Sequence, residues 1–511
     1  MESRVMLGTI REFWRDQRGI AMILVAIMIP ALIGFSVLAV DLTRANALHN
    51  DLQKGADAFA LATAGELDGR SDSITRADRA LANLITGNKY QFASGAEVAT
   101  ILSSAGVSRR YLRSLPASDD TPIRDDVDVI TDEIGDAKSA IFVEVTVTPV
   151  GFDAIFPVSI LQGGGSGSFD VGATAVAGFS QSICETVPIF MCNPFEDAVT
   201  PANSKTIQQA FAAGDTYSRE FRILKVDSNP GPGNFGLLDN GLNSIQDGMA
   251  RGTAGTCYSR NSLTSKTGVT FGQVNTGLNV RFDLYQGSLK NNSDLGYRPA
   301  SNVRKGASKT SNCNKYDVAS DGPPPSAMAL PPGTPFDNAK GMSAPISSNS
   351  FWDSYWSINH GTAYPGSAVN SLTNPTGDLT RPASRYDVYM YEIANDKVKD
   401  QSPAPSKEKG TPSCFKGDLT KADPSRRLIN LAIIDCNANQ DKLNGHTAVR
   451  PDGYASVFLI SPVQKQNPAD ENNPEGTGAE KPISLEIVDV DGPLGNGTLD
   501  KALRNEVQLY R

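Results

Sequence analysis

The sequence predicts an α+β protein with a single N-terminal transmembrane helix that extends into a long stalk helix, a small membrane-proximal α+β module, and a β-rich, disulfide-containing ectodomain. Three observations support this prediction. An uncharged apolar run extends from Ile20 to Val40, alternating strand patterns begin at Ile141, and all six cysteines follow the apolar run. The 511 residues are enough for about two or three domains, and the 46 glycines and 31 prolines indicate many turns.

The apolar run from Ile20 to Val40 has the length of a membrane span. At about 1.5 Å per residue it covers roughly 31 Å, close to the ~30 Å hydrocarbon core of a bilayer. Basic residues are concentrated before it, which predicts a cytoplasmic N-terminus and an exported remainder; they are Arg4, Arg11, Arg15 and Arg18. A cleaved signal peptide is the alternative, since Ala45-Asn46-Ala47 offers a small-x-small site. The run is longer than the ~7–15 apolar residues of a signal peptide, so retention is expected.

The helical pattern continues beyond the membrane run. Apolar residues, followed by Thr63, recur at steps of three and four, which predicts one helix from Ile20 to about Leu67. The positions are Leu42, Ala45, Leu48, Leu52, Ala56, Phe59 and Thr63. Pro30 should bend this helix. Gly34, Ala56 and Ala60 provide small surfaces on which another helix could pack closely. A plain anchor with a helical stalk is the alternative.

Four segments of this region resemble a known family. They are Arg18-Gly-Ile-Ala-Met22, Pro30, Val40-Asp-Leu-Thr-Arg44 and Leu52–Ala62. Together they resemble the N-terminal signature of TadG-like proteins of tight-adherence (Flp) pilus systems, over residues 18–64. The segments Arg426–Cys436 and Ala455–Pro462 are similar to the closing region of such proteins. The resemblance implies a pilus-assembly role in the bacterial inner membrane, beside other pilus-assembly or pilin-like membrane proteins.

Two family features are missing from the sequence. Pilin-like members are processed at a glycine followed by glutamate at the fifth position, but the fifth residue after Gly19 is Leu24. Some TadG-like chains carry a metal site of the form Asp-x-Ser-x-Ser, but the nearest segment here is Asp435-Cys-Asn-Ala-Asn439. The resemblance therefore implies neither processing at Gly19 nor that metal site.

Further periodic segments define the exported part. The apolar face of residues 74–85 predicts a helix, and alternation over 141–148 and 171–179 predicts two strands of a small module. Beyond Cys184 we expect short strands at Phe221–Val226, Val280–Tyr285, Arg385–Ile393, Leu428–Ile434, Tyr454–Ile460 and Ile483–Val490. The predicted parts are a basic cytoplasmic N-terminus (1–19), the transmembrane helix (20–40), a helical stalk (41–69), the α+β module (70–181) and a β-rich periplasmic domain (182–511) with loops near 319–346 and 464–481.

The cysteines are expected to form disulfides, because they all lie on the exported, oxidising side. They are Cys184, Cys192, Cys257, Cys313, Cys414 and Cys436. Sequence order suggests the pairs 184 with 192, 257 with 313 and 414 with 436, although six cysteines allow 15 connectivities. Zinc is not expected, because the three histidines are far apart in sequence and the chain has no Cys-x-x-Cys motif.

Composition and motifs indicate no cofactor. The net charge of −9 argues against nucleic acid as a partner. The glycine-rich segment 231–236 lacks the acidic residue that a dinucleotide site requires, and Leu494 stands where a calcium loop opening at Asp489 needs glycine. We therefore expect no catalytic, cofactor or metal residues, and a non-catalytic assembly or structural component. The alternative is a tethered envelope adhesin or glycan-binding module, with Trp352 and Trp356 as an aromatic platform.

Overall fold

The computed structural model describes most of the chain from Arg18 onward. The described residues are 18–85, 89–90, 100–101, 104–116, 118, 120–156, 168–197, 199–225, 230–242, 244–260, 262–266, 271–306, 313, 327–369, 374–378, 380–401, 408–443, 445–463, 482–492, 494–497 and 499–510. The chain forms two compact units, unit 1 with residues 1–180 and 505–511, and unit 2 with residues 181–504. Assigning 182–511 to a single domain was therefore wrong for the last seven residues, which belong to unit 1.

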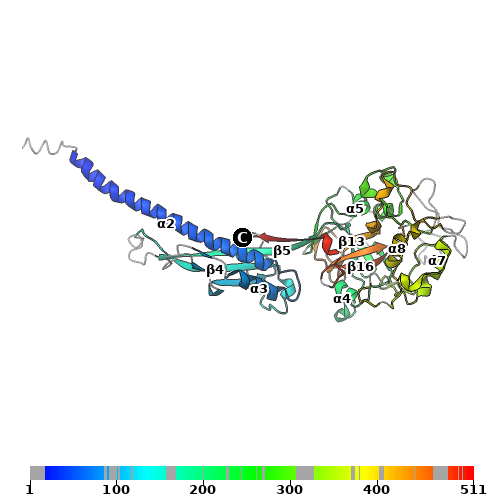
Figure 1. The fold of residues 1–511 in the computed structure, drawn as a ribbon. Helices are drawn as coiled ribbons and strands as arrows, with labels where there is room; N and C mark the ends of the chain where they lie inside the picture. The colour runs from blue at the N-terminus through cyan, green and yellow to red at the C-terminus, as the bar shows by residue number, and fades with distance from the viewer. Residues whose placement is uncertain are drawn as a thin grey trace, which may run out of the picture. The chain divides into compact units, whose positions relative to one another are not determined.

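Unit 1 is built on one long helix. Helix α2, Arg18–Ala64, confirms the predicted continuation of the membrane helix into a stalk and contains Pro30. The predicted second helix is α3, Ser73–Ile85. Figure 1 shows α2 lying along the sheet of unit 1, beside strand β4.

The sheet of unit 1 has the strand order β17-β5-β4-β3. Its strands are β3 (Val107–Leu112), β4 (Phe142–Asp153), β5 (Ser168–Ile183) and β17 (Leu503–Leu509), and a separate hairpin joins β1 (Lys89–Tyr90) to β2 (Thr100–Ile101). The predicted period of two is confirmed, since Val143, Val145 and Val147 are buried and pair with alanines of β5. This face forms one core with the inner half of α2.

Unit 2 contains a ten-stranded sheet with the order β11-β12-β7-β16-β15-β13-β6-β8-β10-β14. In chain order the strands are β6 (Ile189–Cys192), β7 (Phe221–Lys225), β8 (Asn234–Leu238), β10 (Leu263–Lys266), β11 (Phe336–Asp337), β12 (Met342–Ser343), β13 (Leu428–Ile434), β14 (Ala448–Val449), β15 (Gly453–Leu459) and β16 (Ile483–Val490). The short β9 (Tyr258–Ser259) pairs with the end of β5. Four of the strands expected here are confirmed, as β7, β13, β15 and β16.

Both faces of the central strands are covered. Val457 and Leu459 of β15 belong to the core that includes helices α4 (Ile207–Ala212), α5 (Ile245–Arg251) and α6 (Phe271–Asn279). Phe458 packs on the other face, against α7 (Asp353–His360) and α8 (Arg385–Ala394). This double coverage explains why β15 is buried along its whole length.

Short 3₁₀ helices connect these elements. They are η1 (Ser104–Gly106), η2 (Ala137–Ser139), η4 (Pro201–Asn203), η5 (Val280–Phe282), η6 (Gly287–Leu289), η7 (Leu295–Tyr297), η8 (Asn349–Trp352), η9 (Gly366–Ala368), η10 (Lys397–Lys399), η11 (Leu419–Lys421), η12 (Pro424–Arg427) and η13 (Leu499–Ala502).

Two predicted strands are wrong. The segment Arg385–Ile393 forms helix α8, because Ser384 and Asp387 close a capping box at its start. The segment Val280–Tyr285 begins as η5, which ends at Asp283 with a left-handed φ of 62°. Of the predicted loops, 327–346 contains the short strands β11 and β12, whereas 319–326 and 464–481 lie outside the described residues.

All six cysteines form disulfides, but the predicted pairing in sequence order is wrong. The bonds join Cys184 to Cys257, Cys192 to Cys436, and Cys313 to Cys414. Strands β6 and β13 are parallel neighbours, with Cys192 opposite Ile434, so Cys436 is in reach although it lies 244 residues away. The pairing of β5 with β9 likewise places Cys184 near Cys257. Proximity in the sheet decides these bonds, and proximity in sequence does not.

Candidate functional site

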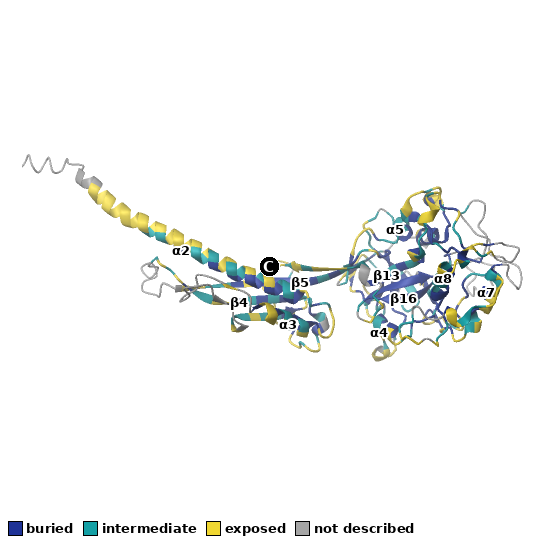
Figure 2. Cartoon of the chain, in the orientation of Figure 1, coloured by how far each residue is buried: buried dark blue, intermediate teal, exposed yellow. Residues whose placement is uncertain are grey.

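The outer half of α2 exposes an apolar surface. Its large side chains from Met22 to Leu42 are largely uncovered, with Ile27 67% and Phe35 71% exposed. The helix is long and apolar enough to cross a membrane. A soluble protein rarely exposes so many large apolar side chains together, whereas lipid would solvate them. Figure 2 shows this exposed part in yellow, followed by a part of the same helix along which dark blue, buried residues alternate with teal and yellow ones.

The inner half of α2 is a core helix of unit 1. Buried residues recur at steps of three and four and are Leu48, Leu52, Ala56, Phe59, Ala60 and Ala64. We expected Ala56 and Ala60 to receive another helix, but both are 0% exposed and pack within unit 1. Packing of these two alanines on a helix of another protein was therefore wrong, because they are buried in the core that α2 forms with helix α3 and the sheet of the same chain. Gly34 lies in the outer half and is partly exposed, so its role in helix packing stays a prediction.

A polar contact marks the point where the apolar half of α2 ends. Asp41 Oδ2 accepts a hydrogen bond from the backbone N–H of Phe156 at 2.6 Å, and Asp41 Oδ1 accepts one from Arg44 at 3.1 Å. Burial alone would raise the pKa of Asp41, but the N–H groups of Phe156 and Ile155, together with Arg44, lower it. The Arg44 guanidinium lies 5.1 Å from the centre of the Phe152 ring. These contacts fasten the end of the β4 segment to α2 at this level.

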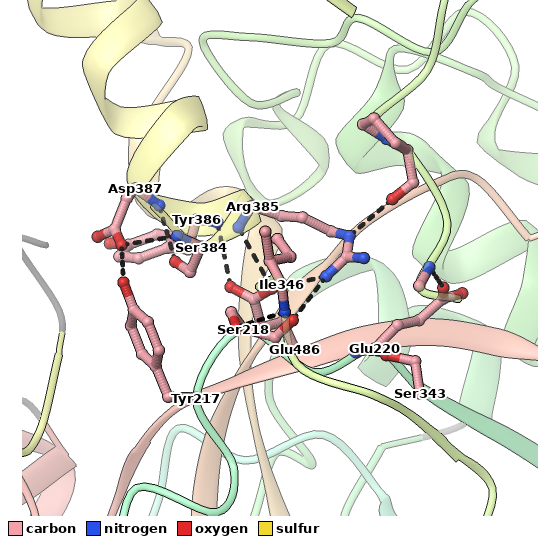
Figure 3. A network of polar contacts seen from close by, with 12 residues as sticks. Tyr217, Ser218, Glu220, Ser343, Ile346, Ser384, Arg385, Tyr386, Asp387 and Glu486 are labelled. Atoms are coloured by element: carbon pink, nitrogen blue, oxygen red, sulfur yellow. Dashed lines mark hydrogen bonds and ion pairs between the residues drawn. The ribbon is translucent and has the colours of Figure 1, made fainter. Parts of the chain in front are cut away.

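Unit 2 contains a buried polar network at the start of α8 (Figure 3). Arg385 donates to the carbonyls of Pro331 and Ser218 and to Glu486, at 2.8, 3.1 and 3.2 Å. Glu486 also accepts the N–H groups of Arg385 and Tyr386. Burial raises the pKa of Glu486, against the attraction of Arg385. The network ties α8 to strand β16.

The second carboxylate of this network is similarly engaged. Asp387 accepts hydrogen bonds from the backbone N–H of Ser384 and from the hydroxyl of Tyr217, each at 3.0 Å. Figure 3 shows the side chains of Asp387 and Arg385 pointing in different directions. Each carboxylate therefore serves to hold backbone and side chains in place.

His360 lies in a second buried cluster. Its Nε2 is 2.8 Å from Glu392 and its Nδ1 is 3.1 Å from Asp400. Tyr355 donates to the same Glu392 at 2.9 Å. Burial opposes ionisation of Glu392, but His360 and Arg304 lower its pKa. Both ring nitrogens of His360 face carboxylates, so neither is directed toward a nucleophile, as general-base catalysis would require.

A third group of carboxylates lies at the end of β13. Glu196 accepts the N–H groups of Cys436 and Asn437, each at 2.8 Å. Burial raises the pKa of Glu196 to about 7, and it raises that of Asp452 to about 6. Asp452 accepts a hydrogen bond from Asn193 at 3.0 Å. These carboxylates brace the strand ends beside the Cys192–Cys436 bond.

The structure overturns the aromatic-platform hypothesis. Trp352, Tyr355 and Trp356 are 0%, 1% and 2% exposed and pack in the core against α8. They therefore offer no surface on which a sugar ring could stack. The alternative adhesin function loses the observation on which it rested.

The remaining motifs have structural roles. The glycine-rich segment leads into strand β8 instead of a helix, and a Cβ on Gly233 would lie 2.9 Å from the backbone of Gly341. Asp489 accepts N–H groups of Val490, Asn496 and Leu499. Gly492 and Gly497 have left-handed φ values, as expected of glycines in turns. Within the described residues no cluster of His, Cys, Asp or Glu could hold a metal ion.

Sequence reasoning missed one site, a surface pocket in unit 2. Residues 213–215, 217–219, 345–347 and 380–382 line it, and its volume is about 390 Å³. The first segment, from 213 to 219, lies more than a hundred residues before the other two, and all three lie in loops. No local sequence motif therefore identifies the pocket.

Comparisons with known proteins point to the N-terminal helix. Residues 19–66 match a family model described as putative Flp pilus-assembly TadE/G-like, which confirms the resemblance of this segment. No curated protein and no solved structure matches the chain. The match supports involvement in Flp pilus assembly, and together with the candidate membrane helix it fits a single-pass membrane protein.

Proposed function

We propose, on the premise that residues 19–66 form a Flp pilus-assembly TadE/G-like segment, that this chain is a membrane-anchored, non-catalytic assembly or structural component of a Flp pilus system. The observation that carries the proposal is the two-part character of α2. One continuous helix exposes an apolar half suited to lipid and buries its other half in the core of unit 1. The matched segment thus provides both anchor and scaffold.

Charge and redox chemistry support an orientation in which the bulk of the chain lies in the periplasm. The arginines before Ile20 favour a cytoplasmic N-terminus, with the bulk of the chain in the periplasm and α2 in the bacterial inner membrane. Three disulfides suit an oxidising compartment. The apolar half of α2 also offers a surface to other pilus-assembly or pilin-like membrane proteins. Gly34 lies on this part of the helix.

A non-catalytic role is supported by the way the buried ionisable groups are used. Glu486, Asp387, Glu392 and Glu196 all accept hydrogen bonds from backbone or side-chain donors that hold elements together. Groups engaged in this manner stabilise a fold and are not presented to a substrate. We therefore assign unit 2 to contacts with other proteins or ligands.

A deletion experiment tests the proposed function. Cells that lack this chain should lose Flp pili, counted by electron microscopy, and the full chain supplied in trans should restore them. A chain in which residues 20–40 are replaced by a cleavable signal peptide should not restore them, because it is exported without an anchor. Normal pilus numbers in the deletion strain, combined with lost adhesion, would contradict the proposal and favour a tethered adhesin.

A further inference from the structure

Two arginines and one aspartate line the pocket in unit 2, so its lining carries more positive than negative charge. Its volume of about 390 Å³ lies in the range of small-ligand sites, which is roughly 300–1,000 Å³. Arg219 and Arg381 line it together with Asp215, Ser347 and Thr380. Pro345, Ile346 and Pro382 add apolar lining.

Arg219 has no carboxylate in direct contact among the described residues. Its Nη1 donates to the backbone carbonyl of Ser343 at 2.8 Å. Burial lowers the pKa of Arg219, and the more distant Asp215 opposes this effect. Asp215 itself accepts a hydrogen bond from Lys205 at 2.6 Å. A half-buried guanidinium without a direct counter-ion is costly, and a bound anion would offset that cost.

Arg381 is held in the pocket wall with part of its hydrogen-bonding capacity unused. Its Nη1 is 3.5 Å from the carbonyl of Gly214, and its Nε is 3.7 Å from Asp378, beyond hydrogen-bond distance. Gly214 has a φ of +75°, and a Cβ there would lie 2.7 Å from the Arg381 Nη1. A side chain at this position would strain the backbone and would push the end of the Arg381 side chain away.

Hydrogen bonds hold the pocket residues next to the two arginines in place. Tyr217 donates to the carbonyl of Pro382 and to Asp387 at 3.1 and 3.0 Å. Ser218 has a φ of 57°, rare for a residue with a side chain, and its hydroxyl accepts the N–H of Ile346 at 3.0 Å. Figure 3 shows Tyr217, Ser218 and Ile346 joined to the network of Arg385 and Glu486. A site built on such contacts is ordered before a ligand arrives, which lowers the cost of binding.

We propose that this pocket binds a small organic anion whose carboxylate or phosphate contacts Arg219 and Arg381. Lys205 pairs with Asp215 and Asp378 pairs with Arg381, so three positive groups and two negative groups surround the pocket. This positive excess favours a negatively charged ligand. The pocket volume limits the ligand to a small molecule, and the apolar lining provides for its carbon skeleton. The proposal is independent of the pilus function, since it rests on unit 2 alone.

Titration calorimetry on the full chain in detergent micelles tests the site with four probes. Glucuronate and glucose 6-phosphate represent a carboxylate and a phosphate on the same carbon skeleton, glucose is the neutral control, and inorganic phosphate lacks the skeleton. At least one organic anion should bind more tightly than glucose and inorganic phosphate. The tighter of the two anions tells whether the site takes carboxylates or phosphates.

Variants connect binding to the two arginines. Arg219→Gln and Arg381→Gln should each weaken binding about tenfold or more, because each removes a charge-assisted contact. Gly214→Ala should weaken it by displacing Arg381. Arg113→Gln, which removes an exposed pair with Asp136 in unit 1, is the matched control and should leave binding unchanged.

Three results would overturn the proposal: glucose binding as tightly as the anions, inorganic phosphate binding as tightly as glucose 6-phosphate, or no binding of either organic anion. Unchanged affinity in a folded Arg219→Gln/Arg381→Gln variant would also overturn it. Melting curves identify variants that fail to fold. If Arg219→Gln fails to fold, Arg219→Lys, which keeps the charge, and Arg381→Gln replace it. Unchanged affinity in a folded Arg381→Gln variant would then overturn the proposal.

Discussion

Ala56 and Ala60 show how single residues of α2 serve the fold. Both are 0% exposed and share one core cluster with Phe59 and the alanines of β5. Small side chains allow the helix backbone to approach the sheet closely. The sequence predicted close packing at these positions, but it could not identify the partner surface, because an alanine stripe fits a sheet of its own chain as well as a foreign helix.

The Ala60→Leu variant tests this residue-scale account. The larger side chain has no space in the core and should lower the free energy of unfolding of unit 1 by about 1–3 kcal/mol. Ala58→Leu is the matched control, because Ala58 is exposed on the same helix. The same exchange of alanine for leucine, two residues of similar helix propensity, is made at both positions. Denaturant unfolding of the full chain in detergent measures both. Equal stability of the two variants would show that Ala60 is not packed as the structure has it.

At the scale of elements, both the local sequence pattern and the packing of the segment decide whether it forms a helix or a strand. We predicted a strand over Arg385–Ile393, yet the segment is helix α8. Its buried positions, Arg385, Val388, Tyr389 and Glu392, follow helical spacing, and the Ser384–Asp387 capping box was readable in the sequence. The predominantly apolar segment Leu428–Ile434 was correctly predicted as a strand and forms β13, which is buried along most of its length. In β16 apolar residues alternate with Ser484 and Glu486, a pattern that also indicates a strand.

The disulfides depend on which strands become neighbours, which the sequence alone could not reveal. Cys192 and Cys436 are both 0% exposed, whereas Cys257 is exposed to solvent. Thiol–disulfide exchange requires that a thiolate reach the sulfur atom. Under native conditions a mild reductant should therefore open Cys184–Cys257 before Cys192–Cys436.

Differential alkylation followed by mass spectrometry measures this order. Untreated protein should yield cross-linked peptides for 184 with 257, 192 with 436 and 313 with 414. Peptides joining Cys184 to Cys192 would contradict the connectivity, and simultaneous labelling of all cysteines in folded protein would contradict the difference in burial.

At the scale of the whole molecule, the sequence predicted the N-terminal part better than the rest. The apolar run, the stalk helix and the β4–β5 pattern of unit 1 are all local signals and were readable. The return of residues 505–511 to unit 1 was not, because a terminal strand carries no mark of the sheet that it joins. The arginine pocket was missed for a similar reason, since its three segments meet only after folding.

The central claim is that α2 anchors an exported protein in the membrane while its inner half forms the core of unit 1. Reporter fusions test it most directly. A reporter active only in the periplasm should be active when fused after Arg511 and silent when fused before Met1, and an N-terminal epitope should stay on the membrane-bound protein. Activity only in the fusion before Met1, or release of a mature chain without the epitope, would contradict the claim.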